Sequence, residues 1–153
     1  MANSNTTQVA GILSVPPTPQ KVGDIGGRVR TLQGSFALTA LPAGDTICIG
    51  KLPKGARLLP QSCIMITTAQ GTATLAVGSA PSQANGQLGG TITASKYGSA
   101  RAYTTAGTPM FLDQVYTVGV EITADYGEDI YITIGTAAAT PGTLKSFLQY
   151  VVD

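Results

Sequence analysis

The sequence predicts an all-β fold, an antiparallel sandwich or barrel. Apolar and polar residues alternate with a period of two in several short segments, as in strands with one buried face. Turn residues such as Pro, Gly and Asp separate these segments about every 8–12 positions, the spacing typical of antiparallel β folds. We predict a β-sandwich of roughly eight strands over residues 28–153, preceded by an extended arm over residues 1–27.

The arm is predicted from its composition. Its second half, SVPPTPQKVGDIGG, combines a proline cluster that favours extended backbone with glycines that add no packing surface. A disordered tail is the alternative that composition alone leaves open. The arm also carries an apolar strip that can lie along a neighbouring surface: Val9, Ile12, Leu13 and Val15.

The strands of the body follow in chain order. We expect them at SFALTA (35–40), TICIGKL (46–52), SCIMITT (62–68), TATLAVG (72–78), VYTVGVEITA (115–124) and IYITIGT (130–136). In the first, alternation places Phe36, Leu38 and Ala40 on one side. In the last two, it assigns these side chains to the core: Val118, Val120, Ile122, Ile130, Ile132 and Ile134.

Two regions have weaker patterns. Residues 78–114 are rich in small side chains, and we expect a long excursion with short strands at TITA (91–94) and PMFL (109–112) and a helical turn around residues 99–103. The C-terminal TLKSFLQYVVD fits both a helix and a strand. The preceding TPG turn and the β-branched end favour the strand.

Charge and composition exclude several classes of function. Only 11% of the residues are charged and the net charge is +1, which argues against binding nucleic acid or another polyanion. No apolar run is long enough to span a membrane. So neutral a surface favours self-association.

The residues that usually perform catalysis are scarce. The chain has no histidine, so the commonest general base and zinc ligand is missing. Cys48 and Cys63 lie in apolar runs, where thiols act as small hydrophobic residues, and spacing alone leaves their pairing open. The acidic cluster Asp125, Glu128 and Asp129 lacks EF-hand spacing and is typical of a solvated turn. We expect no enzyme activity, no cofactor and no required metal.

A basic turn lies between the second and third expected strands. Lys51, Lys54 and Arg57 stand there among prolines and glycines, and Arg28 and Arg30 stand where the arm ends. No aromatic residues alternate with these cations, as single-stranded nucleic acid binding would require. We interpret them first as charges that protect a turn and its edges, and second as a contact surface for an acidic protein partner.

The run GDTICIGKLPKGARLLPQSCIMITTAQGTATLAVGSA resembles structural proteins of tailed bacteriophage heads. The shared pattern is an apolar strand after GD, an LPxGA turn, a second strand and then GxxTLxVG. It covers about residues 40–80, and the hairpin GVEITADYGEDIYITIG supports it further on. The chain departs from the pattern after VG, where relatives often carry acidic residues and this chain reads SAPSQANG.

The resemblance is to small decoration or cement proteins, and it implies a jelly-roll or related sandwich. It further implies a virion protein that binds the outside of the major capsid lattice and stabilises the head, often as a homotrimer. The alternative is the base or receptor-binding β-module of a head or tail fibre. Both imply a location in the virion and the major capsid protein or other copies of the chain as partners, with no nucleic acid and no membrane.

Overall fold

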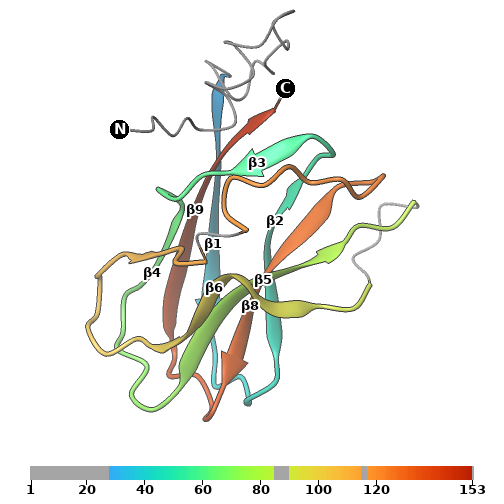
Figure 1. The fold of residues 1–153 in the computed structure, drawn as a ribbon. Helices are drawn as coiled ribbons and strands as arrows, with labels where there is room; N and C mark the ends of the chain where they lie inside the picture. The colour runs from blue at the N-terminus through green and yellow to red at the C-terminus, as the bar shows by residue number, and fades with distance from the viewer. Residues whose placement is uncertain (1–27, 85–89, 115–116, 153) are drawn as a thin grey trace, which may run out of the picture.

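The computed structural model describes residues 28–84, 90–114 and 117–152. These residues form two antiparallel β-sheets that pack face to face (Figure 1). The all-β sandwich that the alternation predicts is therefore confirmed. No helix in the described ranges is long and apolar enough to cross a membrane.

In the described part of the chain, nine strands build the two sheets. They are β1 (Val29–Leu38), β2 (Thr46–Leu52), β3 (Ala56–Leu58), β4 (Cys63–Ile66), β5 (Thr74–Pro81), β6 (Thr93–Ala102), β7 (Met110–Phe111), β8 (Glu128–Gly135) and β9 (Gly142–Val152). One sheet has the order β1-β9-β4-β7, with the short β3 also paired to β9. The other has the order β2-β8-β5-β6.

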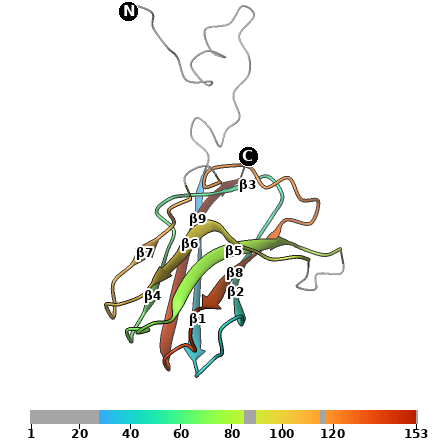
Figure 2. The same cartoon turned by 60° about the horizontal axis from the view of Figure 1, so that its bottom comes forward.

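This strand order is that of a jelly roll. The first and last strands pair as β1 with β9, and the strands next to them in the chain, β2 and β8, pair in the opposite sheet. The chain therefore rolls up as a long folded ribbon, with four main strands in each sheet. The start of β1 and the end of β9 lie side by side at one end of the sandwich (Figures 1 and 2).

The core lies between the sheets and is formed by alternate residues of the central strands. Ile130, Ile132 and Ile134 of β8 are fully buried, as their period of two predicts. Ile66 of β4 and Leu148 of β9 are equally buried on the facing sheet. The C-terminal segment is a strand, so the choice of strand over helix is confirmed.

The expected strand at 115–124 is wrong. Residues 117–119 form a turn, Gly119 has a φ of 85°, and only Glu121 makes an isolated bridge, to Arg57. Val120 is 54% exposed, whereas Ile122 is buried and Val118 packs against the edge of the core. Residues 115 and 116 lie outside the described residues.

Backbone hydrogen bonds hold this segment against β3, although it is not a strand. The Gly119 N–H donates to the Leu58 carbonyl oxygen, and the Ile122 N–H donates to that of Ala56. The segment thus lies along β3 as an irregular loop.

The first expected strand needs a smaller correction, because Phe36 and Ala40 are exposed and only Leu38 of that face is buried.

The region 78–114 is more regular than predicted. Its main element is the ten-residue β6, which includes residues 99–102, so the expected helical turn is wrong. The strand expected at PMFL is present as β7. Small residues hide the alternation of β6 in the sequence, and the pairing of β6 with β5 is irregular.

Gly78 permits that irregularity. Between the paired positions Val77↔Gly98 and Ser79↔Thr93, β6 carries several more residues than β5 and crosses close to its backbone. A Cβ at Gly78 would lie 2.0 Å from the Thr93 carbonyl oxygen, far inside contact distance. Only glycine fits this approach of two backbones.

We expect Gly78→Ala to destabilise the protein by about 1–3 kcal/mol, because β6 must shift away from β5. Urea unfolding of the variant measures the loss. Gly71→Ala is the control for a glycine in open space, although its φ of 59° adds a strain of its own. An unchanged unfolding midpoint for Gly78→Ala would show that β6 does not approach β5 this closely.

Candidate partner-binding surface

Each cation of the basic turn faces a carboxylate of β8 or of the segment that leads into it. The Lys54 Nζ lies 2.7 Å from the Asp125 Oδ1, and an Arg57 guanidinium nitrogen lies 3.2 Å from the Glu121 Oε2. The Lys51 Nζ lies 3.9 Å from the buried carboxylate of Asp129. The turn is therefore charge-matched within the chain, which favours its structural role.

The Lys54–Asp125 pair is fully at the surface. The hydrogen bond to Asp125 and its charge raise the pKa of Lys54, and the same contact lowers the pKa of Asp125. Both groups thus stay ionised at neutral pH. Exposed pairs of this kind add little to stability, and they leave no net positive patch for an anionic partner.

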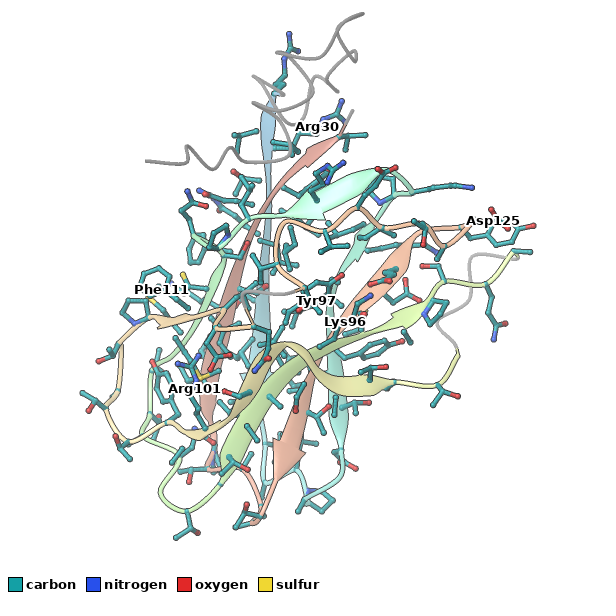
Figure 3. The ribbon with its side chains drawn as sticks, viewed as in Figure 1. Arg30, Lys96, Tyr97, Arg101, Phe111 and Asp125 are labelled. Atoms are coloured by element: carbon teal, nitrogen blue, oxygen red, sulfur yellow. The ribbon has the colours of Figure 1, made fainter. Side chains whose placement is uncertain are left out.

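Two other predicted contact residues lie across β9 from Arg57, because the start of β1 and β3 pair with the end of β9 from opposite sides. Arg28 and Arg30 are exposed where β1 begins, and no ion pair joins them to another described residue (Figure 3). The apolar strip of the arm, Val9, Ile12, Leu13 and Val15, lies outside the described residues. Among the described residues, Arg28 and Arg30 are thus separated from Arg57 by β9.

The acidic cluster separates in the fold. Asp125 is exposed and pairs with Lys54, whereas Glu128 and Asp129 open β8 and are buried on its two faces. Asp129 accepts a hydrogen bond of 2.7 Å from the Ser82 hydroxyl. In the described part of the chain, no group of three or more Asp, Glu, Cys or His side chains could hold a metal ion.

Glu128 is the centre of a buried polar network. Its Oε2 accepts hydrogen bonds from the Ser79 hydroxyl at 2.7 Å and from the Tyr97 hydroxyl at 2.8 Å. Its Oε1 lies 2.5 Å from the Lys96 Nζ, which also stands over the Tyr97 ring, 5.2 Å from its centre (Figure 3). The network ties β5, β6 and β8 together at one end of the four-stranded sheet.

Electrostatics keep Glu128 ionised and the Tyr97 hydroxyl protonated at neutral pH. Burial by itself raises the pKa of Glu128, but the hydrogen bonds from Lys96, Ser79 and Tyr97 outweigh it and leave that pKa lowered. Burial and the Glu128 charge raise the pKa of Tyr97, so its hydroxyl remains a donor. The sequence offered one signal, the charged Lys96 in a stretch with few charges, but nothing in it showed which acid Lys96 meets.

The outer face of the five-stranded sheet carries a second feature that the sequence did not reveal. Four residues form a row across it in register, Gln33 on β1, Phe147 on β9, Cys63 on β4 and Phe111 on β7. Phe111 is 50% exposed, and Phe147 and Cys63 are half-buried. Cys63 is a free thiol, as is Cys48 in the other sheet. The row gives this face an apolar strip.

A pocket of about 260 Å³ opens beside Phe111, between the end of β6 and the start of β7. Arg101 lines it, but a guanidinium N–H donates to the Phe111 carbonyl oxygen and the Nε lies 3.5 Å from the Asp113 carboxylate. The remaining lining is mostly threonine, alanine, proline and methionine. The only charged side chain of the pocket is therefore already engaged, and the pocket lacks the set of reactive groups that an active site needs.

The fold and these surfaces define a jelly-roll sandwich with an apolar strip on one outer face and with the cations of its basic turn paired to acids of the same chain. The chain matches no protein-family model and no curated protein. Among solved structures, a chain of the cyanophage Pam1 capsid asymmetric unit has a similar fold, with a TM-score of 0.57. The two chains are 22% identical, and the match covers all of both. The likeness shows a shared fold over the full length.

Proposed function

We propose that this chain is a structural protein of a bacteriophage virion, without enzyme activity. It binds the outside of the major capsid lattice and stabilises the head, as decoration or cement proteins do. The observation that carries the proposal is the full-length likeness to a chain of a phage capsid. The LPxGA and GxxTLxVG motifs point to the same class, and both lie on the turns and strands of the jelly roll.

Two properties of the surface support a role in assembly. Charges are few, so covering this surface removes water from fewer ionised groups than on an average protein surface. The outer face of the five-stranded sheet adds half-exposed aromatic side chains, the residue type enriched in interfaces. We propose these contact residues: Val9, Ile12, Leu13, Val15, Arg28, Arg30, Lys51, Lys54 and Arg57.

A protein of this kind stabilises a shell by adding buried interface, so many copies must bind and the shell must become harder to disrupt. Quantitative mass analysis of purified particles should find this chain in hundreds of copies, in a fixed ratio to the major capsid protein. Particles that lack it should lose their DNA at a lower temperature. A handful of copies per particle would favour a head or tail appendage, and complete absence from particles would overturn the proposal.

A further inference from the structure

The edge strands of the two sheets differ in how they are protected. β7 has only two residues, β2 is interrupted by a bulge between Cys48 and Gly50, and the register of β6 shifts twice. Short edge strands and bulges are the usual protection against pairing with other chains. β1 has neither, because it pairs with β9 over ten residues in unbroken register.

The edge of β1 that faces away from β9 presents backbone N–H and C=O groups. In β9, the Gln149 N–H donates to the Ser62 hydroxyl, and its carbonyl oxygen accepts from the Leu59 N–H. Odd-numbered residues of β9 thus bond away from β1, so the odd-numbered residues of β1 also direct their N–H and C=O groups away from β9. These residues are Val29, Thr31, Gln33, Ser35 and Ala37, and no described strand pairs with them.

The side chains along this edge suit an apolar, neutral partner. Phe36, on the face that turns toward the core, is 40% exposed at the open edge, and Val29 is 54% exposed. Arg30 is the only charge in β1, and the strand contains no lysine or proline to discourage pairing. An added strand would bond the edge groups and cover Phe36.

We propose that the free edge of β1 accepts residues 8–15, QVAGILSV, of a second copy of this chain as an added strand. The segment has no charge and carries the β-branched residues Val9, Ile12 and Val15. The inference goes beyond the proposed function: it adds the self-association that the sparse charge predicts, and it specifies the donor and the acceptor. Because one chain's arm meets another chain's edge, the contact is head-to-tail and can close into a ring such as a trimer.

The sequence between donor and acceptor favours a second copy over the chain's own arm. Residues 16–27 include Pro16, Pro17 and Pro19, which lack N–H groups, and several glycines. The prolines stiffen the chain directly after the donor segment. If all twelve residues took the extended proline geometry, at ~3.1 Å per residue, they would reach about 37 Å. That reach compares with the length of β1, about 34 Å at ~3.4 Å per residue, and would be enough to place the donor on a neighbouring molecule.

Two variants of the full chain separate donor from acceptor. Ser35→Pro removes an N–H from the free edge but no hydrogen bond to β9. We therefore expect this variant to fold but to be unable to bind an added strand along β1. Ser35→Ala keeps the N–H and is its matched control. The double substitution Ile12→Asp and Leu13→Asp places two charges in the donor and leaves the body unchanged. Gln33→Pro replaces Ser35→Pro if circular dichroism shows that the latter does not fold.

Light scattering after size exclusion then gives the mass of each protein. The natural chain and Ser35→Ala should be oligomers, and the two defective variants should be monomers of 15.6 kDa. Mixing the two defective variants should yield a 1:1 dimer, because one supplies an intact arm and the other an intact edge. Absence of that dimer, an oligomeric Ser35→Pro chain or a monomeric natural chain would each overturn the inference.

These outcomes are separate from those of the particle experiment. Arm exchange between purified copies can be measured without any capsid, and its failure leaves binding to the capsid lattice possible. Conversely, a chain that exchanges arms but is absent from particles would retain this inference and lose the proposed function.

Discussion

Ile132→Ala is expected to lower the free energy of unfolding by about 2–5 kcal/mol, the range for truncating a large buried side chain. Ile132 is fully buried in β8, a central strand of the four-stranded sheet, and pairs with Ile47 on one side and Val77 on the other. Both neighbours are held in ladders, so the sheet cannot collapse into the space that the lost atoms leave. Denaturation by urea at neutral pH measures the change.

Val120→Ala is the matched control, because the alternation of the sequence assigned Val120 to the core as well. With 54% of its surface exposed, it should change the unfolding free energy by less than about 0.5 kcal/mol. A loss that small for Ile132→Ala would mean that the buried face of β8 has been assigned backwards. Equal losses for the two variants would contradict the loop structure of residues 117–122.

These two residues also show what the sequence can predict. Alternation identifies the buried face of β8 because that strand is paired on both sides, so its side chains have only two directions to point. The same alternation fails at Val120, which is exposed, because a left-handed glycine at position 119 breaks the strand; Ile122 is buried as predicted. The glycine was visible in the sequence, but its conformation depends on the contact of this loop with β3.

The candidate site was predictable only in part. The cations and the acids were both apparent, yet their pairing joins positions 71 residues apart for Lys54 and Asp125, and no local pattern encodes it. The outer row of Phe147, Cys63 and Phe111 needs the register of three strands, which comes from tertiary pairing. The long, unprotected edge of β1 likewise becomes apparent only once the sheet order is known.

Glu128→Gln is expected to lower the free energy of unfolding by about 3 kcal/mol. That is the lower end of the range for breaking a buried ion pair, because Lys96 keeps 30% of its side chain exposed. A glutamine amide offers one oxygen where the carboxylate offers two, so it cannot accept from Lys96 on one side and from Ser79 and Tyr97 on the other. Asp125→Asn is the control, since it removes the same charge from an exposed pair and should leave the melting temperature unchanged.

The pH dependence tests the mechanism behind that loss. The pKa of Glu128 is lower in the folded protein than its ordinary value of 4.5, so the folded state favours the ionised form. The resulting stabilisation is complete above the ordinary value and disappears as the pH falls through the lowered one. The gap in unfolding free energy between the natural chain and Glu128→Gln should therefore be constant at neutral pH and shrink below about pH 4.5. A gap that stays the same down to strongly acidic pH would show that the substitution acts through packing, and that the charge of Glu128 does not hold β5, β6 and β8 together.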